Sequence, residues 1–179
     1  MSTETNDGRI VAVCISPQHG FPTYPQERVV VGPLGIEGDA HSGPMRESFT
    51  KPGTFKENDR SISIVADEVR QEMNDTLGLN MLPGDFNEQV LVSGLGDLGD
   101  VAIGDQVHFD TGVQLEVTDR AYPCTKLEAH NGSGLIKALA EKRDGEIYTR
   151  RGILTRVLQT GELQAGVSVT IKRINPQQP

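Results

Sequence analysis

The sequence predicts a mainly β fold, a closed β-barrel with a few peripheral helices. Short segments with alternating apolar and polar residues recur along the chain, and tight turns containing Gly, Asp or Pro join them. Only 4% of the residues are aromatic and there is no Trp, so the core must consist mostly of Val, Ile and Leu. This rhythm of short strands favours a barrel or closed sheet over a doubly wound α/β fold.

Strands are predicted where β-branched residues alternate with polar ones or cluster in short runs. They cover residues 9–16, 28–32, 60–66, 88–94, 105–109, 113–119 and 167–173. A further segment, 152–163, is interpreted as a strand followed by a glycine turn. The sequence FDTG at 109–112 joins two alternating runs and predicts a hairpin.

Two helices are predicted. Residues 66–78 place Val69, Met73 and Leu77 at helical spacing, and the segment ends in glycine. Residues 133–143 place four apolar side chains on one side, with basic residues near the end.

The predicted organisation is a single domain over residues 9–175. Residues 1–8 are polar and are expected to form a short disordered lead-in, without the apolar core of a signal peptide. Residues 42–60 are polar and contain Pro and Gly, which predicts a long mobile loop inserted into the domain.

The net charge of −8 argues against binding to bulk nucleic acid, although a local basic pocket remains compatible with it. No apolar run approaches the ~20 residues that a membrane-spanning helix needs. The two cysteines, Cys14 and Cys124, do not resemble a disulfide framework, so free thiols and a cytoplasmic location are expected.

Cys124 stands where a predicted strand ends and the chain turns at Tyr122-Pro123. A cysteine acts as a nucleophile or metal ligand only as the thiolate, which the flanking Arg120 and Lys126 could favour. The alternative is a small apolar side chain that fills the strand end. Cys14 lies inside an apolar run and is interpreted as a core residue.

The segment GIEGDAHSG, residues 35–43, surrounds Asp39 and His41 with glycines. Gly38 and Gly43 could let a ligand approach the backbone closely, and Asp39 and His41 could orient a substrate or each other. The alternative is a glycine-rich turn with solvated polar side chains.

The segment LPGDFNEQ, residues 82–89, crowds polar groups, including Glu88 and Gln89, in front of a predicted strand. These side chains could hydrogen-bond a heterocycle or could cap the turn. Arg150 and Arg151 stand out in an acidic chain, as does Arg60 at the start of a strand. Arginines bind phosphate well, but surface ion pairs are the alternative.

Taken in order, these segments resemble the MOSC family, which is named for the C-terminal domain of molybdenum-cofactor sulfurase. The resemblance runs through nearly the whole chain and is carried by GIEGDAHSG, RSISIVADE, LPGDFNEQVLVSGL, IGDQVHF, LEVTDRAYPC and RRGILTRVLQTGELQAGVSV. It implies a β-barrel with peripheral helices.

The resemblance also implies a site. Cys124 matches the family's key cysteine, whose thiolate ligates molybdenum in members that bind the molybdenum cofactor. Small bacterial members resemble reductases of N-hydroxylated compounds that draw electrons from partner flavoproteins. The family has also been proposed to carry sulfur as a persulfide.

For the cofactor-binding residues, the resemblance implies roles of four kinds. Arg60 and Arg150 or Arg151 would meet the cofactor phosphate, and Gly38 and Gly43 would allow close approach. Asp39 and His41 could bond the pterin or orient their loop. Glu88 falls at the family's Glu position, and Gln89 stands where the family usually has Asn.

Three functions remain open from the sequence. The first is an enzyme in which Cys124 binds the molybdenum cofactor for the reduction of N-hydroxylated or N-oxide substrates. The second is a non-catalytic module that carries sulfur or presents the cofactor to another protein. The third is a structural barrel in which Cys124 only packs.

Overall fold

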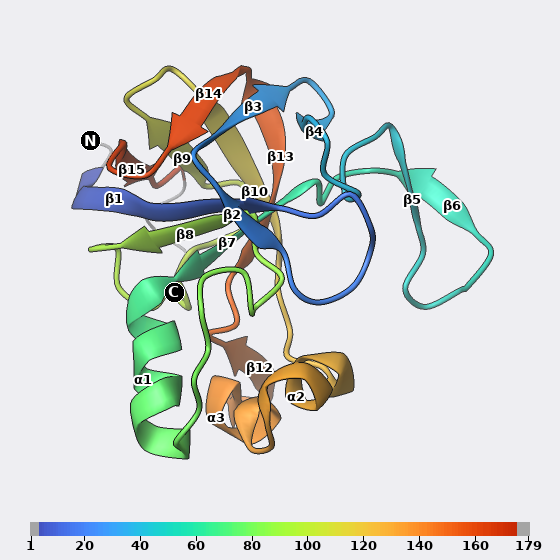
Figure 1. Ribbon diagram of the computed structural model, residues 1–179, viewed down its shortest axis with the longest axis vertical. Coiled ribbons are helices and arrows are strands. Elements are labelled where there is room, and N and C mark those ends of the chain that lie inside the picture. Colours follow the sequence, from blue (N-terminus) through green and yellow to red (C-terminus); the bar gives the residue numbers. More distant parts are fainter. Residues whose placement is uncertain (1–3, 175–179) are drawn as a thin grey trace.

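The computed structural model describes residues 4–174 and contains a closed barrel of seven strands (Figure 1). Around the barrel the order is β1-β15-β9-β10-β13-β7-β8, and β8 pairs with β1 to close the ring. The barrel strands are β1 (Glu4–Ile15), β7 (Ile62–Ala66), β8 (Val90–Ser93), β9 (Gln106–Phe109), β10 (Gln114–Arg120), β13 (Ile153–Gln159) and β15 (Ser168–Lys172). The predicted closed barrel is confirmed.

Smaller sheets surround the barrel. A short strand, β2 (Tyr24–Gln26), pairs with the end of β1. A three-stranded sheet contains β14 (Gly161–Gln164), β3 (Arg28–Gly32) and β4 (Gly35–Ile36). Two separate hairpins are formed by β5 (Met45–Glu47) with β6 (Phe55–Glu57) and by β11 (Ala140–Arg143) with β12 (Glu146–Thr149).

Three helices gather at one end of the molecule, at the bottom of Figure 1: α1 (Asp67–Leu77), α2 (Thr125–Asn131) and α3 (Leu135–Leu139). The first was predicted, and it ends at Gly78 in the left-handed conformation. It connects β7 to β8, which are parallel neighbours and therefore need a crossover rather than a hairpin. No helix among residues 4–174 is long and apolar enough to cross a membrane.

The predicted helix over residues 133–143 is wrong in its second half. The helix α3 ends at Leu139, and Ala140 begins β11, which pairs with β12. The reason is the turn at Asp144 and Gly145, which both have positive φ, of 50° and 86°. A two-residue Asp-Gly loop of this kind closes a hairpin, and the pairing of its flanks overrides the helical pattern.

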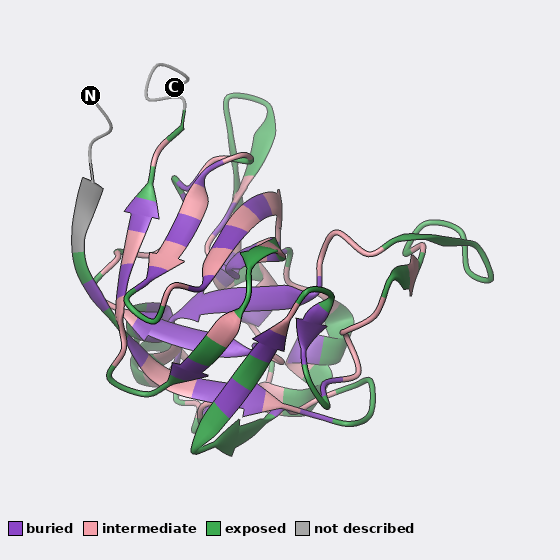
Figure 2. Cartoon of the chain, turned by 90° about the horizontal axis from the view of Figure 1, so that it is seen from above, coloured by how far each residue is buried: buried purple, intermediate pink, exposed green. Residues whose placement is uncertain are grey.

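Two predictions about irregular segments also need correction. The predicted lead-in over residues 1–8 extends too far, because β1 begins at Glu4. The backbone of this polar segment pairs with β15, and backbone pairing does not require apolar side chains. The loop over 42–60 is not structureless, since it contains the hairpin β5–β6, which stands away from the barrel (Figures 1 and 2). Residues 1–3 and residue 175, the predicted end of the domain, lie outside the described residues.

The core fills the barrel with aliphatic side chains, as the composition predicts. Val, Ile and Leu dominate it, and Phe86 and Phe109 are its buried aromatic residues. Buried and less buried positions alternate along β9 and β10, which the predicted hairpin at 109–112 joins (Figure 2). The five residues of β7 are all buried, because this strand lies between β8 and β13 with α1 packed against it.

Candidate functional site

Five strands of the barrel end or begin at the same end of the molecule. Val13 of β1 lies opposite Val90 of β8, and Ile64 of β7 lies opposite both Val90 and Ile153. Arg120, the last residue of β10, pairs with Ile153, the first residue of β13. The segments just beyond these strand ends therefore lie around one edge of the barrel, which we call the rim. It carries residues 16–24, 58–61, 84–89, 120–124 and 150–152. Residues 38–43 join it through a hydrogen bond from the N–H of Ala40 to the carbonyl of Ser16.

Cys124 lies at the rim, directly before α2. Its side chain is partly buried and packs against the hydrophobic core, but it is not enclosed. The backbone carbonyl of Cys124 accepts a hydrogen bond from the N–H of Leu127, at 3.1 Å. The helix start therefore holds the cysteine in place.

Cys14 has the opposite environment. It is fully buried in β1, and burial, with a smaller contribution from Glu88, raises the pKa of its thiol to about 12. A thiol with such a pKa does not form the thiolate near neutral pH. The interpretation of Cys14 as a core residue is confirmed.

Arg151 brings a positive charge to the rim from just before β13. It is only 9% exposed, and its Nη2 donates a hydrogen bond to the carbonyl of Phe86. Its Nη1 is buried and has no hydrogen-bond partner among the described residues. Burial lowers the pKa of its guanidinium, while Glu88 and Cys124 both act to raise it, so Arg151 lies within electrostatic range of both.

Glu88 is completely buried and caps the turn that precedes β8. Its carboxylate accepts hydrogen bonds from the N–H groups of Gly84, at 2.7 Å, and Phe86, at 3.1 Å. Burial raises the pKa of Glu88 to about 7, against the opposing effects of these hydrogen bonds and of Arg151. The capping role that the sequence left open is therefore observed, in a carboxyl that also faces a buried cation.

Gln89 connects this turn to the segment around Asp39. Its Oε1 accepts hydrogen bonds from the N–H and the hydroxyl of Ser63, at 2.8 and 3.1 Å. Its Nε2 lies 3.3 Å from Nδ1 of His41 and 3.5 Å from Oδ1 of Asp39. Gln89 thus fixes these two side chains against the barrel.

Asp39 and His41 form a pair across two residues. Oδ1 of Asp39 lies 2.9 Å from both the backbone N and Nδ1 of His41, and Oδ2 accepts from the N–H of Ser16 at 3.0 Å. Burial alone would raise the pKa of Asp39, but the hydrogen bonds from His41 and Ser16 outweigh it and hold the pKa below its usual value. Asp39 is therefore an anion, and it orients a partly exposed imidazole.

The loop before β2 covers the rim between this pair and α2. The ring of His19 meets the ring of His41 edge-on, with centroids 5.0 Å apart. Phe21 packs against His130 of α2, with centroids 5.8 Å apart. One loop thus contacts both the Asp39–His41 pair and the helix that follows Cys124.

The predicted glycines and Arg60 also lie at the rim. Gly38 and Gly43 both have positive φ, of 82° and 132°, and open space surrounds the position of a Cβ on Gly43. Arg60 pairs with Asp119 of β10, and its Nε is buried without a hydrogen-bond partner among the described residues. Its charge is thus largely neutralised by a residue close to Cys124 in the chain.

Arg150 has a different environment from its neighbour Arg151. Its guanidinium pairs with Glu72 of α1 at 2.7 Å and donates to the carbonyl of Ala138 at 3.0 Å. The surface ion pair that the sequence left open for these arginines is therefore what Arg150 forms. Arg151 is the member of the pair that lies within electrostatic range of Cys124 and Glu88.

Some residues of the rim carried no local signal in the sequence. Asn58 donates from Nδ2 to the carbonyls of His41 and Gly43, at 2.7 and 2.9 Å, and so holds the glycine-rich segment from the far side of the inserted hairpin. Thr23 donates its hydroxyl to the carbonyl of Glu88 at 2.6 Å. Both act over long separations in sequence, which no periodicity or spacing reveals.

The rim thus offers one partly buried thiol and a buried guanidinium that lies within electrostatic range of this thiol and of a protonatable carboxyl, with an oriented imidazole on the same edge. Among residues 4–174, no group of three or more His, Cys, Asp or Glu side chains is arranged to hold a metal ion. A soft metal at Cys124 would therefore need most of its ligands from a cofactor.

Comparisons with known proteins bear on this arrangement. A family model described as the MOSC domain matches residues 37–170. Among solved structures, the chain is similar to the YuaD protein from Bacillus subtilis, with a TM-score of 0.79 and 23% identity over 96% of this chain and 98% of that one. It is also similar to YiiM from Geobacillus stearothermophilus, with a TM-score of 0.65 and 22% identity over 95% of this chain and 77% of that one. A search of the curated proteins gives no match.

The turn at Gly84 generates a stability prediction. Gly84 has a φ of 98°, and a Cβ there would lie 2.0 Å from the backbone oxygen of Thr23. Gly104 has a similar φ, of 93°, but open space around it, so Gly104→Ala is a matched control for backbone strain alone. We expect Gly84→Ala to lower the free energy of unfolding by about 2 kcal/mol more than Gly104→Ala in urea denaturation. Equal losses would contradict the close approach.

Glu88 generates a pH prediction. Its pKa is about 7 in the folded protein and 4.5 as a free carboxyl, so between these values the folded protein holds a proton that the unfolded chain has released. Raising the pH through this window must therefore destabilise the fold. In urea denaturation at several pH values, we expect the wild type to lose a few kcal/mol relative to Glu88→Gln between pH 4.5 and 7.

The exposed Glu27 supplies the control for this experiment, because Glu27→Gln changes the same charge where water solvates it. Its pH profile should run parallel to that of the wild type. Parallel profiles for the wild type and Glu88→Gln would show that the buried carboxyl does not retain its proton.

Proposed function

The chain belongs to the MOSC domain family, and on this basis we propose that it binds a molybdenum cofactor through the thiolate of Cys124. We further propose that it uses the bound cofactor to reduce N-hydroxylated or N-oxide substrates. The family membership supports the kind of cofactor, and the contacts at the rim support the residues that would hold it.

The unpaired Nη1 of Arg151 is the observation that carries this proposal. A buried N–H group that lacks an acceptor is costly, so a ligand that supplies one would bind favourably there. Because Arg151 lies within electrostatic range of Cys124, such an acceptor would belong close to the thiol. A phosphate or pterin oxygen of the cofactor has the required chemistry, since arginine forms strong, charge-assisted hydrogen bonds to phosphate.

The available donors fit a metal that brings most of its own ligands. The rim supplies one thiolate, a soft donor suited to molybdenum in a dithiolene environment. Cys124 would hold the metal and Arg151 would hold an anionic part of the cofactor, while Gly43 leaves the backbone open to close approach. When bound, the cofactor would supply two-electron redox chemistry, which the side chains of this protein lack.

The Asp39–His41 pair supports the proton requirement of the reaction. Reduction of an N–O bond consumes two electrons and two protons and releases water. Asp39 holds Nδ1 of His41, so the imidazole could hold or deliver a proton at Nε2. The electrons would have to come from a partner protein, for which a flavoprotein is our proposal.

A second function rests on the same thiol. Cys124 could carry sulfur as a persulfide, whose terminal sulfur is an anion that the free Nη1 of Arg151 could stabilise. The buried position of Cys14 keeps it from competing for that sulfur or forming a disulfide with Cys124. In this case the chain would pass sulfur or cofactor to another protein without turnover of its own.

The first test of the proposal is metal content. The protein is purified from cells that make the molybdenum cofactor, and molybdenum per chain is measured by mass spectrometry. We expect near-stoichiometric metal in the wild type and almost none in Cys124→Ala, because the thiolate is the protein's ligand. Cys14→Ala is the matched control, and it should retain the metal.

The outcomes of this test separate the two functions. Cyanide-releasable sulfur on Cys124 in a chain without molybdenum would support the sulfur carrier and reject the cofactor-dependent reductase. A wild type with neither metal nor labile sulfur would reject both functions, and normal folding of Cys124→Ala would then leave the thiol with a packing role.

The neighbouring arginines supply a second test. Arg151→Gln removes the buried cation beside Cys124, so we expect the molybdenum retained after gel filtration to fall about tenfold. Arg150→Gln removes a charge that pairs with Glu72, and cofactor retention should not change. Equal retention in both variants would remove Arg151 from the site.

A further inference from the structure

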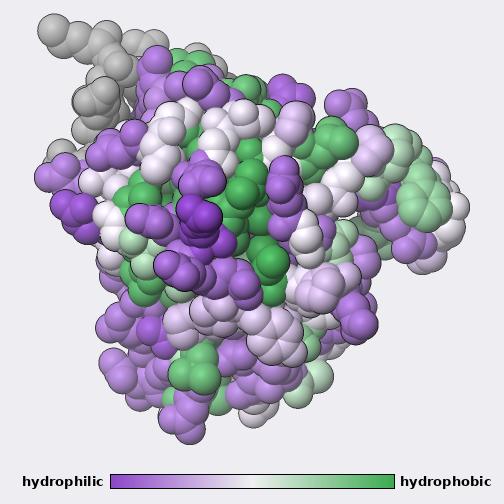
Figure 3. Space-filling model, turned by 45° about the horizontal axis from the view of Figure 1, so that its top comes forward, coloured by the Kyte–Doolittle hydropathy of each residue, from purple (hydrophilic) through white to green (hydrophobic). Residues whose placement is uncertain are grey.

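The inserted hairpin forms an arm that leaves the body of the protein. We define the arm as residues 44–58, which include β5 and β6 and close at their base through a hydrogen bond from the N–H of Asn58 to the carbonyl of Pro44. Asn58 and the ion pair of Arg46 with Asp59 fix this base to the rim. Figures 1 and 3 show the arm standing clear of the barrel.

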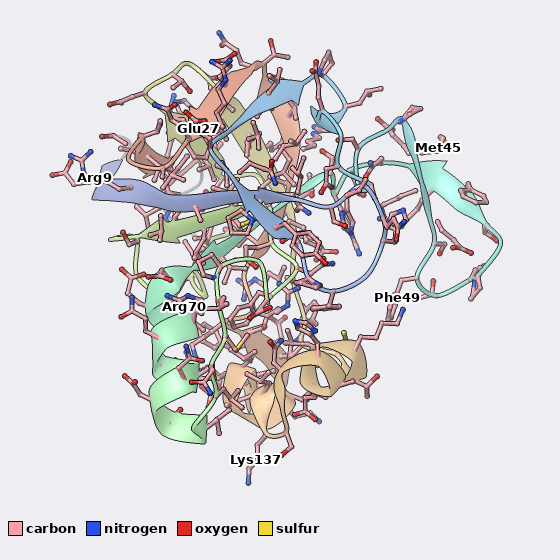
Figure 4. The ribbon with its side chains drawn as sticks, viewed as in Figure 1. Arg9, Glu27, Met45, Phe49, Arg70 and Lys137 are labelled. Atoms are coloured by element: carbon pink, nitrogen blue, oxygen red, sulfur yellow. The ribbon has the colours of Figure 1, made fainter. Side chains whose placement is uncertain are left out.

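The arm exposes apolar side chains that no part of residues 4–174 covers. Phe49 is 87% exposed, Phe55 64% and Met45 53%. Figure 4 shows Met45 and Phe49 on the arm, away from the barrel. A two-stranded hairpin without a packed face is marginally stable in water, and clustered exposed apolar groups are typical of interaction surfaces.

The arm also differs in charge from the rest of the molecule. Lys51 and Lys56 lie within its tip, residues 48–56, and the acids Glu47 and Glu57 flank this tip, whereas the chain as a whole has a net charge of −8. An acidic surface with exposed apolar side chains is the complement of such a tip.

A groove on the barrel carries three acids, Asp100, Asp119 and Glu146, against one cation, Arg120, together with exposed apolar side chains. It has a volume of about 810 Å³ and is lined by Asp100, Ala102, Ile103, Asp119, Arg120, Tyr122, Glu146 and Ile147. Three of its side chains are large, apolar and at least half exposed: Ile103, Tyr122 and Ile147. Among the described residues, neither Asp100 nor Glu146 forms an ion pair, so both acids are available to a cation.

Within one copy of the chain, the groove lies near the base of the arm, but the tip of the arm does not enter the groove. Arg60, two residues beyond the arm, forms an ion pair with Asp119 of the groove, so the base of the arm lies close to the groove. The tip of the arm, however, stands away from the barrel, and its Phe49 is exposed (Figure 1). A second copy related by a two-fold axis near this ion pair would therefore be able to place each tip in the groove of the other copy.

We propose that the chain forms a two-fold dimer in which the arm tip of each copy docks in the acidic, apolar groove of the other. Phe49 and Phe55 cover the apolar lining, and Lys51 and Lys56 meet Asp100 and Glu146. Tyr122 of the groove stands two residues before Cys124, so the proposal places the tip from the second copy against the segment that carries Cys124. This inference does not depend on the proposed function.

The test measures self-association by sedimentation velocity from low micromolar to submillimolar concentration. We expect a dimer whose dissociation constant rises about tenfold in K51E/K56E and in D100K/E146K, because each exchange places like charges together. Combining the four substitutions should restore the affinity. F49S/F55S should weaken the dimer about a hundredfold, because it removes both aromatic anchors.

A matched control makes the same change of net charge elsewhere. K137E/K172E replaces two exposed lysines outside the arm and the groove, and Figure 4 shows Lys137 far from the arm. This variant should dimerise as the wild type does. A wild type that stays monomeric over the whole concentration range overturns the proposal. A dimer whose dissociation constant does not change in the tip and groove variants also overturns it, and so does a combined variant that does not recover the affinity of the wild type.

The rate of Cys124 alkylation provides a second readout in the same variants. If the tip of the second copy shields Cys124 from solvent, iodoacetamide should modify Cys124 several times faster in the monomeric variants than in the dimer. Equal rates in the monomer and dimer would overturn the contribution of the second copy to the site, whatever the metal content of the protein.

Discussion

The burial of Arg151 beside Glu88 is the constraint on which the arrangement of the rim depends. Two ionisable side chains share a region from which water is largely excluded, and burial opposes the charge of each. The turn before β8 partly compensates the cost of burying these charges. Its backbone N–H groups donate to the carboxyl, and one of its backbone carbonyls accepts from the guanidinium. Among the described residues, the Nη1 donor of Arg151 has no hydrogen-bond partner, and an unpaired buried donor of this kind is costly.

The closed barrel explains how residues far apart in sequence come to share this neighbourhood. Parallel pairing of β7 with β8 brings the start of both strands to the rim, where the antiparallel β1 and β10 end. Each segment that follows or precedes these strands then contributes polar side chains without disturbing the aliphatic interior. The hydrogen bonds of Gln89 to Ser63 and the Asp39–His41 pair tie three such segments together, so the site is held by the barrel rather than by its loops.

The period-two segments predicted the barrel strands well. The strands β9 and β10 bury alternate residues against the core, whereas β7 and most of β8 are buried on both faces. Local patterns failed where a tertiary or turn effect competed with them, as at Asp144-Gly145, whose hairpin replaces the second half of a predicted helix. The place of Cys124 at a strand end and the capping role of Glu88 could be read from the sequence, and the structure contains both. The different environments of Arg150 and Arg151 could not be predicted from the sequence. Two adjacent arginines have the same local pattern, and only the position of the strand that follows them determines which one is buried.

The double pairing of β1, with β8 on one side and β15 on the other, has a consequence for the order of events during folding. The ring joins segments from near the start and near the end of the described chain, and such distant contacts form slowly. Until residues 168–172 have left the ribosome, β1 lacks one neighbour and its edge can pair with other chains. Slow closure would therefore make a nascent chain dependent on chaperones that shield open sheet edges.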